Sequence, residues 1–285
     1  MSNSQLTVGS RYRILETLGE GGAGAVYRAW DAAEGREVAL KVLHAPAAGA
    51  SGQTASGPAL EEEFRVLASL SHPHLAEVHD YGITATGLPY FTMELLRGED
   101  LKAFLGREVE RRDRLGGNPL FRELLIQVLS ALDYIHSRGV IHEDLKPSNI
   151  LVLPGRTPAD SGLAPGGPRA KLIDFGLAQK AATAGRAAGG TVEYMAPERL
   201  RGQAGDRRSD LYSFGVLLFE LLTGDPPFRG DSPREVTLKA SVGLPPGALA
   251  EIPEPFRGVI ARLLSRSPAD RFSTGTTTMR GLELA

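Results

Sequence analysis

The stretch "VIHEDLKPSNIL", Val140 to Leu151, places several kinds of polar side chain in one loop between apolar runs. Asp144, Lys146 and Asn149 supply an acceptor, a cation and an amide oxygen, and a second carboxylate, Asp174, follows the strand-like run "AKLI". Oxygen ligands such as Asn149 and Asp174 suit Mg²⁺, which usually completes its shell with phosphate oxygens. Either segment alone reads equally well as a capped turn with solvated charges. The two together favour a site for phosphate and magnesium.

A glycine-rich stretch, "LGEGGAGAV" from Leu18 to Val26, precedes this loop in the chain. Glycines let a backbone approach phosphate oxygens and present its N–H groups to them, although a glycine-rich turn without a ligand is a real alternative. A dinucleotide site would need a helix after the glycines. Here the following "AVYRAWD" alternates as a strand, so the pattern indicates a strand–loop–strand flap.

Lys41 lies in the apolar run "VALKV", where an ammonium is costly to bury without an anionic partner. The competing interpretation is an edge-strand lysine whose ammonium reaches water. The next segment predicts a helix with Leu60, Phe64 and Leu67 on one face. Steps of about 100° per residue put Glu63 on that face, which makes Glu63 the preferred partner of Lys41.

The pattern of apolar residues changes along the chain from mainly period two to mainly helical. Strands are expected in "YRILETLG", "AVYRAWD", "REVALKVL", "LAEVHDYGI" and "LPYFTMELL". The strongest helical patterns are residues 120–139 and 209–224, the latter with Ser209 as a candidate cap and Gly224 as its end. Two segments of small and polar residues, Ala45–Ala59 and Pro154–Pro168, are expected to be mobile loops.

Composition excludes several classes of protein. The formal charge of −2 over 285 residues argues against a chain that coats nucleic acid or an acidic membrane as a whole. No cysteine is present, so disulfides and thiolate metal sites are excluded. The sequence shows neither a signal peptide nor an apolar run of the roughly 20 residues that a membrane span needs. These features predict a cytoplasmic protein without nucleic-acid partners.

The motifs described above, taken in order, resemble those of the eukaryotic-type (Hanks-type) serine/threonine protein kinases of bacteria. The order is G-x-G-x-x-G-x-V from Gly19 to Val26, "VALK" ending at Lys41, "HEDLKPSN" from His142, "DFG" from Asp174 and "APE" from Ala196. The resemblance implies an α+β bilobal kinase fold, with a five-stranded antiparallel sheet and one main helix in the N-lobe and a mostly helical C-lobe. It implies a kinase domain over 12–285, after a tail over 1–11. The N-lobe would span about 12–93, the hinge about 94–97 and the C-lobe about 98–285.

The same resemblance implies ATP and Mg²⁺ as cofactors and assigns roles to individual residues. Lys41, paired with Glu63, would hold the α- and β-phosphates, and Asp144 would orient the substrate hydroxyl while Lys146 neutralises the γ-phosphoryl group. Asn149 and Asp174 would hold magnesium. The nucleotide would also contact the glycine flap, the apolar walls of the adenine site and the hinge backbone, at Leu18, Gly19, Gly21, Gly24, Val26, Ala39, Met93, Glu94, Leu96 and Leu151.

Other matches concern the protein substrate and the scaffold. "GTVEYMAPE" resembles the segment that seats the peptide, with Thr191 near Asp144 and Lys146. Glu198 and Arg271 match a buried structural ion pair, and Asp210 matches an aspartate that braces the catalytic loop. The expected partner is therefore a protein substrate, and the chain itself is a candidate substrate.

Glu143 departs from the family pattern, in which an arginine usually holds a phosphorylated activation loop. We expect activation that does not depend on loop phosphorylation, with Glu143 paired to Lys180 or Arg186; a Glu143 that simply faces water is the alternative. Thr183 remains a candidate phosphosite. Two other functions stay open: a pseudokinase that binds nucleotide as a scaffold, and a small-molecule phosphotransferase, which the intact peptide-seating segment disfavours.

Overall fold

The computed structural model describes residues 7–21, 24–44, 57–108, 112–155, 166–174 and 192–283, with side chains at all of these except 57–60, 63 and 112–114. The described residues divide between two compact units, one up to Arg97 and one from Gly98 onward. Most of the two expected mobile loops lies outside the described ranges.

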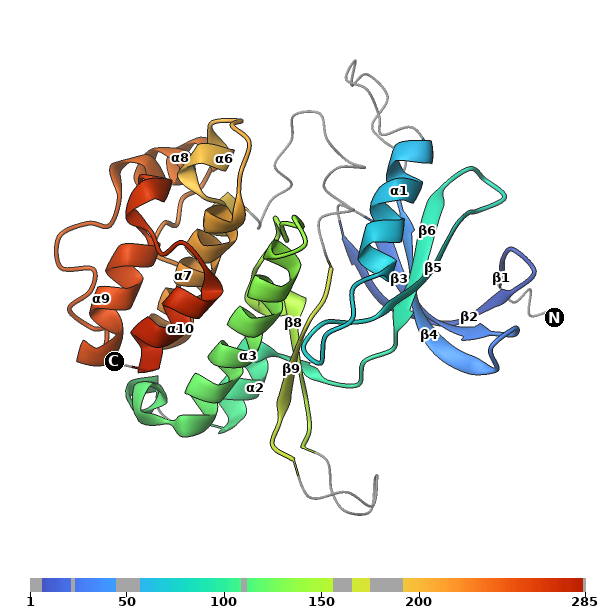
Figure 1. Ribbon diagram of the computed structural model, residues 1–285, viewed down its shortest axis with the longest axis horizontal. Helices are drawn as coiled ribbons and strands as arrows, with labels where there is room; N and C mark the ends of the chain where they lie inside the picture. The colour runs from blue at the N-terminus through green and yellow to red at the C-terminus, as the bar shows by residue number, and fades with distance from the viewer. Residues whose placement is uncertain are drawn as a thin grey trace. The chain divides into compact units, whose positions relative to one another are not determined.

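The first unit is built on an antiparallel sheet with the strand order β1-β2-β3-β4-β6-β5 (Figure 1). Every strand predicted from the period-two pattern is confirmed. The prediction of five strands was wrong by one, because Thr7 and Val8 pair with Arg13 and Tyr12 at the sheet edge. Gly9 turns the chain there with φ 61°, a conformation that costs glycine little. The strands are β1 (Thr7–Val8), β2 (Tyr12–Gly21), β3 (Gly24–Asp31), β4 (Arg36–Leu43), β5 (Val78–Ile83) and β6 (Pro89–Glu94).

The helix α1 (Gly57–Ala68) packs on this sheet beside β5 (Figure 1). Phe64 and Leu67 of α1 are buried, as the helical spacing predicted. A core cluster of Tyr12, Ala29, Val38 and Leu40 lies among β2, β3 and β4. The helix therefore buries apolar side chains that recur about every 3.6 residues, and the strands bury apolar side chains that recur at every second residue.

The second unit is mainly helical, and α7 (Arg207–Thr223) is its most buried element. Every residue of α7 from Ser209 to Leu222 is buried. Gly224 ends the helix with φ 103°, as predicted. The other helices within the described residues are α2 (Leu101–Glu108), α3 (Pro119–His136), α6 (Pro197–Leu200), α8 (Pro233–Val242), α9 (Glu254–Leu263) and α10 (Gly275–Glu283), with short 3-10 turns η1 (Arg112–Gly117), η2 (Pro147–Asn149), η3 (Val192–Tyr194) and η4 (Pro268–Asp270).

The cap of α7 differs from the prediction. Asp206, rather than Ser209, is the N-cap, and it accepts a hydrogen bond from the Arg208 N–H at 2.8 Å. Ser209 is the third helical residue, and its hydroxyl accepts from the Asp206 N–H at 3.3 Å. This is a reciprocal capping box, in which both residues satisfy N–H groups that the helix leaves unpaired.

A small antiparallel sheet in the second unit positions the polar loop residues. β7 (Glu99–Asp100) pairs with β8 (Ile150–Leu153), which pairs with β9 (Arg169–Leu172). In this register Ile150 lies opposite Leu172. Asn149, just before β8, and Asp174, just after β9, therefore lie at the same end of the ladder.

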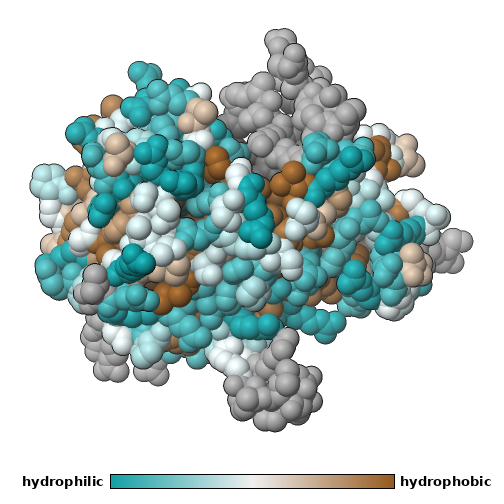
Figure 2. All heavy atoms as spheres, in the orientation of Figure 1, coloured by the Kyte–Doolittle hydropathy of each residue, from teal (hydrophilic) through white to brown (hydrophobic). Residues whose placement is uncertain are grey.

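On the face shown in Figure 2, hydrophobic residues occur in small groups among hydrophilic ones. Among the described residues, the exposed large hydrophobic side chains belong to several separate elements: Leu15, Leu18, Val66, Ile83, Leu238 and Val242. Scattered exposure of this kind is ordinary for a folded surface.

Candidate active site

Asp144 is the centre of the hydrogen bonds within the polar loop. Its Oδ2 accepts from Lys146 Nζ at 2.9 Å and from Asn149 Nδ2 at 3.0 Å, and its main-chain oxygen accepts from Asn149 Nδ2 at 2.8 Å. The other carboxylate oxygen, Oδ1, is buried, and none of the described residues donates a hydrogen bond to it. A buried acceptor without a donor is costly, so it is expected to have a role. Oδ1 is therefore an acceptor available for a proton.

Asn149 and Asp174 provide the oxygens that a magnesium ion would use. The Asn149 amide nitrogen is committed to two oxygens of Asp144, which fixes the orientation of the amide and leaves its Oδ1 as a hard ligand. The Ile173 N–H donates to the Asn149 main-chain oxygen at 2.9 Å and so holds the chain next to Asp174. Asp174 adopts φ 59°, an unusual conformation that occurs at functional sites. The donor set fits a magnesium ion bound together with phosphate.

Asp210 braces the loop from α7, which confirms the prediction. Its buried carboxylate accepts from the His142 N–H at 2.8 Å and from the Glu143 N–H at 2.9 Å. His136 Nε2, at the end of α3, lies 2.7 Å from the same carboxylate. Asp210 thus ties two consecutive backbone groups of the loop to two buried helices. Sequence reasoning did not identify His136, because nothing in the pattern distinguishes it from an ordinary residue near a helix end.

Glu143 forms an ion pair that the sequence did not predict. Arg199 Nη2, in α6, lies 3.3 Å from Glu143 Oε1. The predicted partners Lys180 and Arg186, together with Thr183 and Thr191, lie outside the described residues, so those predictions stay as they were. The interpretation in which Glu143 simply faces water was wrong, because its side chain is only 13% exposed and has a cationic partner.

The predicted pair of Glu198 and Arg271 is confirmed. The guanidinium donates to both carboxylate oxygens, at 2.7 and 2.8 Å, and Ser209 Oγ donates to Glu198 Oε1 at 2.7 Å. Burial alone would raise the pKa of Glu198, but the hydrogen bonds from Arg271 and Ser209 outweigh it and hold the pKa below its usual value. This bidentate pair fixes α6 to α7 and to the segment before Arg271.

In the first unit, Lys41 lies in the middle of the sheet. It is 5% exposed and belongs to β4, opposite Val26 of β3 and Phe91 of β6. The alternative of an edge-strand lysine is thus wrong, because β4 is paired on both sides. Glu63 lies in α1, but its side chain is outside the described part of the chain, so its pairing with Lys41 stays a prediction.

The three glycines of the flap differ in what they require. A Cβ at Gly24 would lie 2.2 Å from the main-chain oxygen of Val42, so packing against β4 is enough to explain this glycine. A Cβ at Gly19 or Gly21 would meet nothing within 4 Å. Close approach of a phosphate therefore stays a prediction for Gly19 and Gly21, with a glycine-rich turn without a ligand as the alternative.

The residues predicted to surround adenine fall into both units. In the first unit, Ala39 and Met93 are buried and Val26 is half-buried, while Leu18 is 48% exposed. Leu151 belongs to β8 of the second unit and is half-buried.

The backbone groups after β6 were predicted to bind the adenine edge. The Glu94 N–H already donates to the Glu77 oxygen at 2.8 Å, so only the Glu94 carbonyl could serve a nucleotide. Leu96 lies outside any strand and is half-buried.

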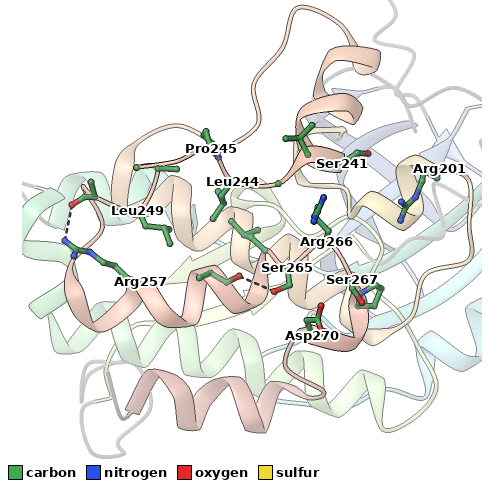
Figure 3. Close-up of a pocket in the computed structure, with 18 residues that line it drawn as sticks. Arg201, Ser241, Leu244, Pro245, Leu249, Arg257, Ser265, Arg266, Ser267 and Asp270 are labelled. Carbon is green, nitrogen blue, oxygen red and sulfur yellow. Dashed lines mark hydrogen bonds between the residues drawn. The ribbon is translucent and has the colours of Figure 1, made fainter.

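A hollow of about 1200 Å³ lies elsewhere in the second unit (Figure 3). It is lined by Arg201, the end of α8, the loop that follows it, α9 and the segment up to Asp270. None of the predicted site residues lines it, so this hollow is not part of the candidate site.

Two kinds of feature are missing from the described ranges. Every helix there is too short or too polar to traverse a lipid bilayer. The same ranges contain no cluster of three His, Asp or Glu side chains able to hold a metal by themselves. A magnesium ion at Asn149 and Asp174 would thus need ligands from phosphate or water.

Comparison with known proteins identifies the family. The protein kinase domain family matches residues 12–280. The chain is 36% identical to the serine/threonine-protein kinase pkn3 of Myxococcus xanthus over 93% of its own length and 48% of that protein. It is 34% identical to the serine/threonine-protein kinase PknB of Mycobacterium tuberculosis over 93% of its own length and 41% of that protein. The chain thus spans about half, or less, of the length of these curated relatives.

Solved structures give the same result for the fold. The kinase domain of Mycobacterium tuberculosis PknI superimposes with a TM-score of 0.69 at 28% identity, covering 100% of both chains. A structure of Rad53 in complex with AMP-PNP gives a TM-score of 0.71 at 28% identity, covering 96% of this chain and 66% of that chain. The predicted α+β kinase fold is confirmed, and the chain belongs to the protein kinase domain family, with the serine/threonine kinases of bacteria among its relatives.

Proposed function

We propose that this chain transfers the γ-phosphoryl group of ATP to serine or threonine hydroxyls of protein substrates. The observation that carries the proposal is Asp144 Oδ1, a buried carboxylate oxygen that no donor among the described residues reaches, while Lys146 and Asn149 both donate to the other oxygen of the same carboxylate. Phosphoryl transfer needs mainly positioning and charge stabilisation, and a fixed acceptor for the hydroxyl proton is one such part.

Within this proposal each polar residue has one task. Asp144 Oδ1 accepts the hydrogen bond of the attacking hydroxyl and later its proton. Lys146 Nζ, now 2.9 Å from Asp144 Oδ2, neutralises charge on the transferred group. Asn149 and Asp174 hold magnesium, which when bound neutralises the phosphate oxygens.

The nucleotide itself is bound by the flap, by Lys41 and by apolar residues. Lys41, paired with Glu63, holds the α- and β-phosphates, and the open space above Gly19 and Gly21 admits phosphate oxygens. Leu18, Val26, Ala39, Met93 and Leu151 surround adenine, while the Glu94 carbonyl and the Leu96 backbone bind its edge.

We further propose that activation does not depend on phosphorylation of the loop around Thr183. The supporting observation is that Glu143, a carboxylate where the family usually has an arginine, already has a cationic partner in Arg199. A phosphate near Glu143 would be repelled rather than held. Autophosphorylation and a cytoplasmic location, where ATP and magnesium are available, belong to the same proposal.

The test of phosphoryl transfer is incorporation of label from [γ-³²P]ATP into a generic basic protein, with magnesium, by the purified chain. Wild type should incorporate label, and Asp144→Asn should lose at least about 100-fold, the usual worth of a general base. Asp225→Asn, at an exposed aspartate of the second unit, is the matched control and should keep the wild-type rate. Equal label from wild type and Asp144→Asn would refute the mechanism. Nucleotide binding without any incorporation would favour the pseudokinase alternative.

The proposal that activation does not depend on phosphorylation of the loop around Thr183 needs a separate experiment. Wild type pretreated with a phosphatase, and the Thr183→Ala variant, should both retain the untreated rate. Mass spectrometry checks that the phosphatase has removed every phosphate. A large loss of rate in either sample would contradict the proposal for activation without contradicting phosphoryl transfer.

A further inference from the structure

The starting observation is the backbone of Glu143, which has φ 67°. Residues with a side chain rarely adopt positive φ, and they keep it only where the surroundings impose it. Here the constraint is Asp210, whose carboxylate receives the N–H groups of His142 and Glu143. The backbone at Glu143 is therefore fixed, and the position of its side chain depends on what the carboxylate contacts.

The carboxylate of Glu143 is mostly shielded from water and contacts α6. Its side chain is 13% exposed, that of Arg199 is 30% exposed, and Arg199 Nη2 lies 3.3 Å from Glu143 Oε1. A charge so shielded is costly unless it is paired, and pairing is stronger there than at a fully exposed site.

Arg199 in turn belongs to a rigid part of the second unit. The residue before it, Glu198, is held by two hydrogen bonds from Arg271 and one from Ser209. The aliphatic part of Arg199 runs past Gly205, where a Cβ would lie 2.6 Å from Arg199 Cδ. Gly205 thus leaves room for this side chain, and α6 offers a fixed anchor rather than a mobile surface charge.

We propose that the Glu143–Arg199 ion pair tethers the catalytic loop to α6, and that Arg199 is a positioning residue for phosphoryl transfer. This inference rests on the proposed function. Arg199 acts through Glu143, the neighbour of Asp144, and α6 begins at Pro197, within the last residues of the segment predicted to seat the peptide. Loss of the tether should therefore affect the reaction with the protein substrate more than the binding of ATP.

In the family, an arginine at this position usually binds a phosphate of the activation loop, whereas here the residue at position 143 carries the negative charge and its partner the positive one. An arginine at position 143 would face Arg199 as a like charge and would need an anion between the two. Glu143 supplies the anion within the chain.

The experiment measures kcat and KM for a protein substrate and for ATP in variants of the whole chain. Arg199→Gln and Glu143→Gln should each lower kcat/KM for the protein substrate about tenfold, with KM for ATP changed less than about twofold. The double variant should lose no more than Glu143→Gln alone, because that single change already removes the pair. Arg201→Ala is the matched control. It is two residues further on, is exposed, has no ion-pair partner among the described residues and lies beside the hollow in Figure 3; it should keep wild-type kinetics.

Exchanging the charges of Glu143 and Arg199 distinguishes a positioning role of their ion pair from a merely structural role. Glu143→Arg places two guanidinium groups together and should be the least active single variant, whereas Glu143→Arg combined with Arg199→Glu should recover at least about half of the lost kcat/KM. Any one of three results would overturn the tether. The losses of kcat/KM could be additive in the double glutamine variant, or the charge-exchanged double variant could recover no activity. Arg199→Gln could also have the same kinetics as Arg201→Ala. A wild type no more active than Asp144→Asn in the same assay would instead overturn the proposed function, and the positioning role with it.

Discussion

His142 is the residue that holds the main chain at Asp144. It is fully buried, and its Nε2 lies 3.0 Å from the Ile173 oxygen, which can only accept, so Nε2 carries the proton. The Asp144 N–H lies 3.3 Å from Nδ1, which therefore accepts. Both contacts require a neutral ring. Burial lowers the pKa of His142, which favours that neutral form despite the nearby carboxylate of Asp210.

This state of His142 predicts a dependence of folding stability on pH. In the unfolded state His142 takes up a proton near pH 6.5, whereas in the folded state it does so only at lower pH. The contribution of His142 to the free energy of unfolding should therefore be complete above about pH 6.5. Below that pH it should fall by up to about 1.4 kcal/mol per pH unit. His142→Gln should be less stable at pH 7.5, yet its urea midpoint should change less between pH 7.5 and 5.5. His79→Gln is the control. The pKa of His79 is also lowered by burial, but His79 is half-buried, so its removal should flatten the curve less. A slope in His142→Gln equal to that of wild type would contradict the assignment.

At the scale of elements, α7 shows why a glycine inside a helix can be required. Gly215 is buried in α7, and a Cβ there would lie 2.7 Å from Leu263 Cβ of α9. The two helices therefore approach each other closely at this point. Gly258, within α9, is exposed, and a Cβ there would meet nothing within 4 Å.

The two glycines should respond to the same substitution in opposite directions. Gly215→Ala should lower the free energy of unfolding by about 1–3 kcal/mol, because an added methyl group overpacks the contact between α7 and α9. Gly258→Ala should raise it by about 0.5–1 kcal/mol, because alanine is the better helix former and the position is open. Urea denaturation of both variants measures the two changes. A gain in stability for Gly215→Ala would show that the helices can separate at little cost.

Local patterns predicted the elements better than their ends. The spacing of Phe64 and Leu67 located α1, and the alternation of "REVALKVL" located β4, because burial imposes these periods. The cap of α7 was misplaced, since Asp206 and Ser209 are both good cap residues and only the capping box distinguishes them. Thr7 and Val8 were missed, because a two-residue strand has no period to detect.

At the scale of the whole molecule, some contacts between distant segments could be predicted because both segments contain recognisable motifs, and others could not. Glu198–Arg271 and Asp210 with the loop were predicted, because each residue belongs to a recognisable motif. The Glu143–Arg199 pair was not, because Glu143 departs from its motif and many exposed arginines could have been its partner. The position of Lys41 between two paired strands needed the strand order, which its local sequence leaves open.

Nucleotide binding should stabilise the folded chain as a whole, and magnesium should contribute through Asp174. A ligand present at about 100 times its Kd adds about 2.7 kcal/mol to the free energy of unfolding. We therefore expect Mg·ATP to raise Tm by several degrees, and EDTA to remove most of that rise. Asp174→Asn tests the residue directly. Asparagine tolerates the positive φ of 59° at this position, so the fold should persist while the carboxylate is lost.

The measurement is a thermal melt with ATP in the presence of magnesium or EDTA. In Asp174→Asn the shift with Mg·ATP should fall to the value that wild type shows with ATP and EDTA, whereas Asp225→Asn, which also removes one negative charge, should behave as wild type. Because Asp225 is exposed and outside the predicted magnesium site, this comparison separates a specific ligand from a change in net charge. If Asp174→Asn kept the full magnesium-dependent shift, the carboxylate at the end of the β8–β9 ladder would not be a magnesium ligand, and Asn149 would lose its proposed role with it.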